Sequence, residues 1–132
     1  MTDTKSERFE RGWATVARIN GPARDQQFKS LGEVAPDFAD WIVEGVYADI
    51  LSRPQLPLRD RELATVAALT AMGNAAGQLK AHVEGALNVG LTREEIVEVI
   101  AQMAIYAGVP AAIRGLLTAK EVFAERDAAG AG

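Results

Sequence analysis

The chain of 132 residues contains one histidine, His82, and no cysteine. Imidazole titrates near neutral pH, so His82 is the first candidate for a general acid or base. The missing thiols exclude disulfides, thiolate metal sites and cysteine nucleophiles. On a helix, His82 would border the apolar stripe of Leu79, Val83 and Ala86. A half-buried structural histidine, bonded to a neighbouring carboxylate or backbone group, fits this pattern as well.

Glu62 is the second candidate. It stands four residues before Val66 and seven before Leu69, so on a helix it points along the packed face. A carboxylate there needs a partner, and such a partner could make it an acid–base group. The alternative is a first-turn glutamate that the helix dipole stabilises. The adjacent Arg61 could pair with Glu62 or hold a substrate carboxylate bidentately, or it could simply be solvated.

The sequence gives little support for a metal site or for a nucleic-acid-binding site. The chain has one histidine and no cysteine. A Glu-x-x-His pair would need a carboxylate at position 79, where this chain has Leu79. We therefore expect no metal site. The formal net charge of −4 and the absence of a basic stripe argue against nucleic acid and against an anionic membrane surface. A helix-turn-helix over 75–107 would carry Glu94, Glu95 and Glu98 on its recognition helix, which disfavours DNA.

Helical periodicity positions these candidates, and no stretch alternates long enough to predict a strand. Capping signals occur at Thr4 with Glu7, at Asn74, and at Thr92 with Glu95. Glycine and proline interrupt the pattern between the segments. We therefore predict an all-α domain with helices over about 5–19, 23–31, 36–50, 59–72, 75–89, 93–107 and 111–125.

Counting residues from the turn at Gly73 and Asn74 brings the two candidates together. Glu62 lies about ten residues before this turn and His82 about eight after it, so each sits roughly 12 to 15 Å from it. Two antiparallel helices would then place both side chains at nearly the same level. We expect them within hydrogen-bond reach or one water of each other, beside a mostly apolar pocket.

The organisation indicates a single domain over 1–132, with an N-terminal helical arm (1–56) and a core (58–124). The first residues lack the apolar stretch of a signal peptide, so we expect a cytoplasmic protein. Two long stretches, 63–79 and 99–113, carry no charge. A small domain can hardly bury both within itself, which predicts a homo-oligomer.

A series of segments resembles the carboxymuconolactone decarboxylase family in order and spacing. The Ser52-Arg53-Pro54 tripeptide is similar to the decarboxylase branch of that family. The main segments are RDRELATVAAL at 59–69, QLKAH at 78–82, EIVEV at 95–99 and AIYAGVPAA at 104–112.

The resemblance implies a compact helical bundle of about six helices that assembles as a hexamer, a trimer of dimers. The alkylhydroperoxidase-type branch needs a Cys-x-x-Cys pair, and the matching positions near Ala75 and Gln78 hold no cysteine. The other branch implies a decarboxylase of 4-carboxymuconolactone, in aromatic-compound degradation, that uses no cofactor. The Glu and His of the proton relay in the alkylhydroperoxidase-type branch match Glu62 and His82, with a one-residue difference in spacing.

In the implied reaction the lactone carbonyl accepts the electron pair as CO2 leaves, so no external electron sink is needed. His82, helped by Glu62, is the candidate proton donor to carbon. Arg61 or Arg53 could hold a substrate carboxylate, and Gln78 and Tyr106 complete the predicted substrate-binding set.

The chain also departs from the decarboxylase branch. Ile113 follows Pro-Ala-Ala where that branch usually has asparagine, Leu117 stands where it often has a further polar residue, and Leu51 replaces a frequent tryptophan. A more apolar pocket would result. Two alternatives therefore stay open: a proton-transfer enzyme acting on another enolisable lactone or acid, and a helical oligomer that binds a ligand without turnover.

Overall fold

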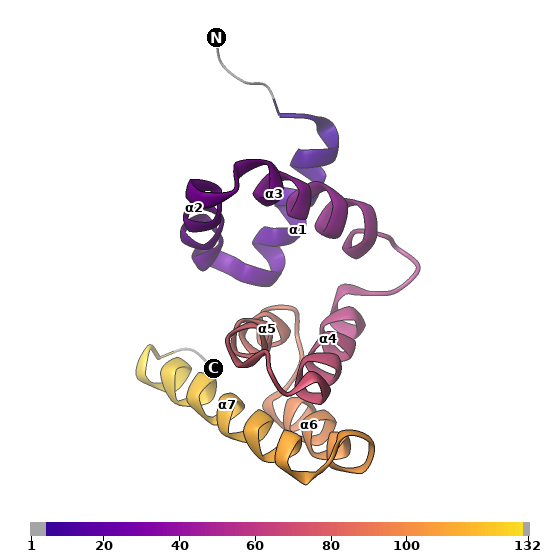
Figure 1. Cartoon of the computed structure of the whole chain (residues 1–132), viewed down its shortest axis with the longest axis vertical. Coiled ribbons are helices and arrows are strands. Elements are labelled where there is room, and N and C mark those ends of the chain that lie inside the picture. Colours follow the sequence, from indigo (N-terminus) through magenta and orange to yellow (C-terminus); the bar gives the residue numbers. More distant parts are fainter. Residues whose placement is uncertain (1–4, 131–132) are drawn as a thin grey trace. The chain divides into compact units, whose positions relative to one another are not determined.

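The computed structural model describes residues 5–130. The chain divides into two compact units, one ending at Leu58 and the other beginning at Arg59. Within the described residues every regular element is a helix, which confirms the all-α class (Figure 1). None of these helices is both long and apolar enough to cross a membrane. The division of one domain into an arm and a core stays a prediction.

The first unit contains five consecutive helical segments. The hydroxyl of Ser6 caps the first of them by accepting a hydrogen bond from the Phe9 N–H at 3.0 Å. The predicted cap Thr4 lies outside the described residues. The segments are α1 (Glu7–Asn20), the 3-10 turn η1 (Gly21–Ala23), α2 (Arg24–Val34), α3 (Pro36–Trp41) and the π-helix η2 (Ile42–Leu51).

Two expectations for this unit are wrong. The helix predicted over 23–31 continues to Val34, because a single glycine at position 32 weakens a helix without ending it. The single α-helix expected over 36–50 changes into the wider π form at Ile42. Periodicity could not show this, because both helix types gather their apolar residues on one face.

Helix α1 packs against η2 at Gly12. A Cβ atom on this glycine would lie 2.0 Å from the carbonyl oxygen of Val43, far inside van der Waals contact. The two backbones therefore approach as closely as they do only because residue 12 has no side chain. The buried apolar residues of this unit are Val16, Ile19, Ala39, Val43, Tyr47, Ala48 and Leu58.

The second unit contains α5 (Ala76–Asn88), α6 (Arg93–Ala107), α7 (Val109–Ala128) and all of α4 (Leu58–Met72) except its first residue. Each of these helices contributes to one apolar core. That core is Val66 from α4, Leu79, Val83 and Ala86 from α5, Leu91 from the following loop, Ile96 and Ile100 from α6, and Ala119 and Val122 from α7.

Two helix ends in this unit differ from the sequence predictions. Helix α5 begins after Ala75 without a side-chain cap, so Asn74 does not have its expected role. Helix α7 continues to Ala128, three residues beyond the end at 125 that the sequence predicted. The Asp127 carboxylate accepts a hydrogen bond from Arg93 at 2.7 Å, and this contact holds the last turns of α7 beside the start of α6.

Helices α6 and α7 form a hairpin whose turn is Gly108 (Figure 1). The φ angle of Gly108 is 100°, a conformation that residues with a side chain rarely adopt. Pro110 lies in the first turn of α7, where its missing N–H costs no helical hydrogen bond. The predicted interruption at this point is confirmed.

The predicted capping box at the start of α6 is confirmed as well. The Glu95 N–H donates to the Thr92 hydroxyl at 3.1 Å, and the Thr92 N–H donates to the Glu95 carboxylate at 2.9 Å. Arg59 of α4 also donates to this carboxylate. The Thr92 N–H, and next the Arg59 guanidinium, hold the pKa of Glu95 below its ordinary value.

Glu95→Gln should change how the stability of the protein depends on pH. The folded state lowers the pKa of Glu95, so the ionised carboxylate stabilises the fold at neutral pH. This stabilisation is lost as the pH falls below the pKa of Glu95 in the unfolded chain, about 4.3, and then through its lower pKa in the folded protein. The variant should be less stable than wild type at pH 7, and the gap should close in acid. Urea unfolding between pH 7 and pH 3 measures this, with Glu94→Gln in the same helical turn as control. A constant gap across that range would contradict the assignment.

Candidate active site

Helix α4 presents one fully buried stripe at four-residue spacing. Glu62, Val66 and Thr70 all lie on it, and each side chain is almost completely inaccessible to solvent. Thr70 satisfies its hydroxyl locally by donating to the Val66 carbonyl at 2.7 Å. Glu62 is the one ionisable residue of the stripe, as the sequence pattern predicted.

Helix α5 holds His82 opposite this stripe. Leu79, Val83 and Ala86, its neighbours along the helix, are buried in the core of the second unit. Charged contacts to α7 flank the histidine on both sides. The Lys80 ammonium lies 2.8 Å from Glu125, and Arg126 donates to the Glu84 carboxylate at 3.1 Å. Such contacts are individually weak, but together with the core they fix the rotation of α5.

The two candidate side chains meet directly. His82 Nδ1 lies 2.9 Å from Glu62 Oε2, which confirms the expectation that they would be within hydrogen-bond reach. The glutamate side chain is 1% exposed and the histidine side chain 19%. When Glu62 is ionised it can only accept, and Nδ1 then carries the proton of this contact, which leaves Nε2 as the ring nitrogen that can act on another group.

The second oxygen of Glu62 has an unusual environment. Oε1 is buried and has no hydrogen-bond partner within the part of the chain that the structure describes. A buried carboxylate with one unsatisfied oxygen is unfavourable unless a positive charge balances it. A proton added to the ring would supply that charge.

The structure places three of the other four predicted site residues in the second unit and one in the first. Gln78 precedes His82 by one helical turn and is exposed, and Tyr106, near the end of α6, is 77% exposed. Arg61 follows the helix one position before Glu62, and adjacent helical residues do not face each other. Arg53 belongs to the first unit, where its Nε donates to the Asp49 carbonyl at 2.6 Å. The substrate-binding roles of these four residues and the expected apolar pocket stay predictions.

Over residues 5–130, no three side chains among His, Cys, Asp and Glu gather closely enough to hold a metal ion. The arrangement that the structure does provide is a carboxylate and an imidazole in contact. Such a pair can move a proton at Nε2 while the carboxylate orients the ring and stabilises its charged form.

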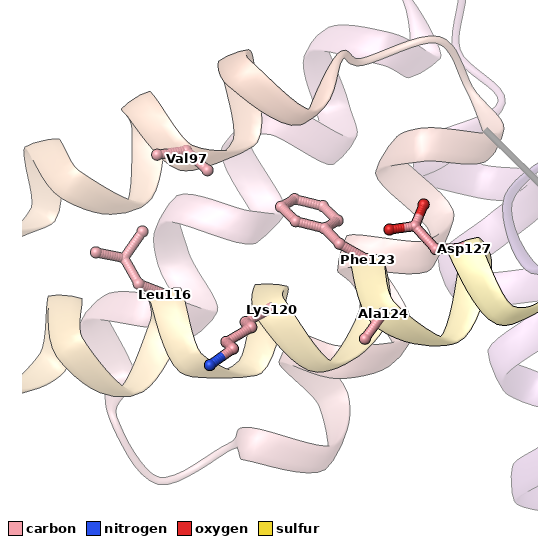
Figure 2. A pocket seen from close by; sticks show the side chains of 6 residues that line it. All are labelled: Val97, Leu116, Lys120, Phe123, Ala124 and Asp127. Atoms are coloured by element: carbon pink, nitrogen blue, oxygen red, sulfur yellow. The ribbon is translucent and has the colours of Figure 1, made fainter.

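A separate surface groove of about 330 Å³ lies between α6 and α7 (Figure 2). Its lining includes Val97, Leu116 and Phe123, with Lys120 and Asp127 at its edges. Arg93 lies over the Phe123 ring, 5.1 Å from its centre. Neither Glu62 nor His82 lines this groove, so it is not the pocket expected beside them.

The comparisons with known proteins agree with this fold. The model of the carboxymuconolactone decarboxylase family matches residues 36–121. The chain is 30% identical over 118 residues to a 4-carboxymuconolactone decarboxylase of Acinetobacter baylyi, covering 89% of this chain and 87% of that protein. It is 31% identical over 132 residues to an uncharacterized 15.0 kDa protein in the nqo9-nqo10 intergenic region of Paracoccus denitrificans, covering 96% and 98%.

The fold and the site define an all-helical protein with a buried carboxylate–imidazole pair between two core helices. The family match covers more than half of the chain and includes both members of the pair. The chain belongs to the carboxymuconolactone decarboxylase family.

Proposed function

We propose that this protein is a cofactor-free decarboxylase of 4-carboxymuconolactone or a similar lactone acid, acting in the cytoplasm in aromatic-compound degradation. The observation that carries the proposal is the hydrogen bond between the buried Glu62 carboxylate and His82 Nδ1. The similarity to the Acinetobacter baylyi 4-carboxymuconolactone decarboxylase supports it.

In this proposal the bond between the ring carbon and the substrate carboxylate breaks, and CO2 leaves. The bonding electron pair moves through the conjugated system onto the lactone carbonyl and forms a dienolate. Protonated His82 then donates its Nε2 proton to carbon, and the dienolate returns to a lactone. Glu62 holds the ring in place and stabilises the imidazolium before the transfer.

Substrate carboxylates need donors, and we propose Arg61 and Arg53 for this task with Gln78 and Tyr106 as further binding residues. Guanidinium groups bind carboxylates through two parallel hydrogen bonds, which fixes orientation as well as charge. Measurement of CO2 release from 4-carboxymuconolactone by the purified protein tests the proposal. Failure to release CO2 from this compound and from related lactone acids would overturn it.

A second candidate is a proton-transfer enzyme acting on another enolisable lactone or acid. The apolar Ile113 and Leu117 of α7 favour it, because they depart from the polar residues of the decarboxylase branch. The Glu62–His82 pair would then remove and return a proton without loss of CO2. Exchange of substrate hydrogen for solvent deuterium, without CO2 release, would distinguish this activity. Ligand binding with neither exchange nor CO2 release would instead indicate the third reading, a non-catalytic ligand-binding oligomer.

We further propose that the chain assembles as a homo-oligomer, with a hexamer made of three dimers as the expected state. The hairpin of α6 and α7 exposes several large apolar side chains, and contiguous apolar surface of this kind marks interaction sites. They are Ile105, Tyr106, Val109, Ile113 and Leu117, each more than half exposed in the single chain.

Ile113→Glu combined with Leu117→Glu should shift the protein toward smaller species, because two charges would enter an apolar contact. Light scattering coupled to size-exclusion chromatography measures the masses of the variant and the wild type. Glu94→Gln, on the exposed start of α6, serves as control. A wild-type monomer near 14.1 kDa would contradict the proposed assembly.

A further inference from the structure

A surface cavity of about 500 Å³, open to solvent, lies in the first unit, where η2 ends. Its lining includes two arginines from segments far apart in the sequence, Arg11 of α1 and Arg53 of the loop after η2. Asp49 and Ser52 supply the remaining polar lining, together with Ala48 and Pro54. The cavity therefore brings two guanidinium groups and one carboxylate to the same surface.

The Asp49 carboxylate is already occupied by a third arginine. Arg8 donates to its two oxygens at 2.9 Å and 2.6 Å. This bidentate contact, and next the charges of Arg8, Arg11 and Arg53, hold the pKa of Asp49 below its ordinary value. Three positive charges thus surround one negative charge here. Glu44, 3.7 Å from Arg8, is the other acidic group in contact with that arginine, and it does not line the cavity.

The polar frame around the cavity is fixed by bonds to the backbone of η2. The Ser52 hydroxyl donates to the Tyr47 carbonyl at 2.6 Å and lies 2.7 Å from the Thr15 hydroxyl. The Arg53 Nε donates to the Asp49 carbonyl at 2.6 Å. Arg11, in contrast, makes no hydrogen bond or ion pair with any residue between 5 and 130. Arg11 therefore lines the cavity without a hydrogen-bond partner among the described residues.

We propose that this arginine pocket, formed by Arg11 and Arg53 beside Asp49, binds a small organic dicarboxylate. The guanidinium fork matches a carboxylate bidentately, and two forks in one cavity suit two carboxylates on one small molecule. The choice of a dicarboxylate as the anion rests on the proposed function. The excess of positive charge, which indicates an anion site, is independent of that function. Arg11 precedes the segment 36–121 that the family model matches, so the pocket joins a residue of the family segment to one outside it.

Titration calorimetry with succinate at low ionic strength tests the proposal on the full-length protein. Arg11→Met should raise the Kd for succinate about tenfold or more, the scale expected when a hydrogen-bonded charge is lost. Arg18→Met, an exposed arginine in the last turn of the same helix, should change the Kd less than about twofold. Arg53→Met should weaken binding as Arg11→Met does, and Arg53→Lys should restore part of it by returning the charge.

Two further binding measurements test the arginine pocket independently of the proposed decarboxylase activity. His82→Asn should bind succinate as wild type does, so a protein without decarboxylase activity can still pass the test. Inorganic phosphate should bind more weakly than succinate, because its oxygens all surround one atom, whereas the two carboxylates of succinate can each take one guanidinium fork. Absence of saturable succinate binding by wild type, an unchanged Kd in Arg11→Met, or equal affinity for phosphate would each overturn the dicarboxylate pocket.

Discussion

His82→Asn should lower the turnover of the proposed decarboxylation by about 10²-fold or more, the usual scale for losing general acid–base help. Asparagine places its side-chain nitrogen close to the position of the histidine Nδ1. It can therefore still donate to Glu62 Oε2, while nothing replaces Nε2. The loss of activity should come without loss of the fold, and the kcat for CO2 release measures it.

A matched variant at the same position separates chemistry from packing. Unlike His82→Asn, His82→Leu removes the donor to Glu62 and leaves a buried carboxylate with no partner at either oxygen among the described residues. Removing one partner of a buried ionic pair typically costs about 3–5 kcal/mol. His82→Leu should therefore melt well below wild type, whereas His82→Asn should melt near it.

Glu62→Gln should reduce turnover more mildly than His82→Asn. The glutamine carbonyl can still accept from Nδ1 and keep the ring oriented, but it carries no charge to stabilise the imidazolium. If His82→Asn instead melts far below wild type and keeps full turnover per folded molecule, His82 is a structural residue and the proposed mechanism fails.

The sequence predicted the meeting of Glu62 and His82 because regular helices make residue counting reliable. Both residues lie on uninterrupted α-helices joined by a short turn, so the rise per residue fixes their level. The burial of Glu62 followed from its spacing to Val66 for the same reason. The capping box of Thr92 and Glu95 was equally predictable, since it depends only on residues three apart.

What the sequence could not predict depends on contacts between distant segments. Arg8 and Asp49 are 41 residues apart, and their contact exists because α1 packs on η2. The sequence therefore did not indicate Arg11 as a binding residue, although it indicated Arg53. The π form of η2 and the absence of a cap at Asn74 were missed because local patterns permit either outcome. The unpartnered oxygen of Glu62 likewise depends on every element around it.

Gly12→Ala should lower the stability of the first unit strongly. The added methyl group would lie 2.0 Å from the Val43 carbonyl oxygen and 2.9 Å from its carbon. Both are backbone atoms, so no side chain can rotate to make room, and α1 and η2 must move apart. Overpacking of this kind costs about 1–3 kcal/mol and occasionally more, and we expect a value near the upper end. Such a loss lowers Tm by roughly 10 °C in a chain of this size.

Gly32→Ala is the matched control within the same unit. A Cβ atom at Gly32 of α2 meets no atom within 4 Å, so the substitution adds helix propensity without a clash. It should leave stability unchanged or raise it by up to about 1 kcal/mol. Both tryptophans of the chain, Trp13 and Trp41, lie in the first unit, so their fluorescence during urea unfolding reports on that unit directly. Equal unfolding midpoints for Gly12→Ala and Gly32→Ala would show that α1 and η2 do not need the close approach at Gly12.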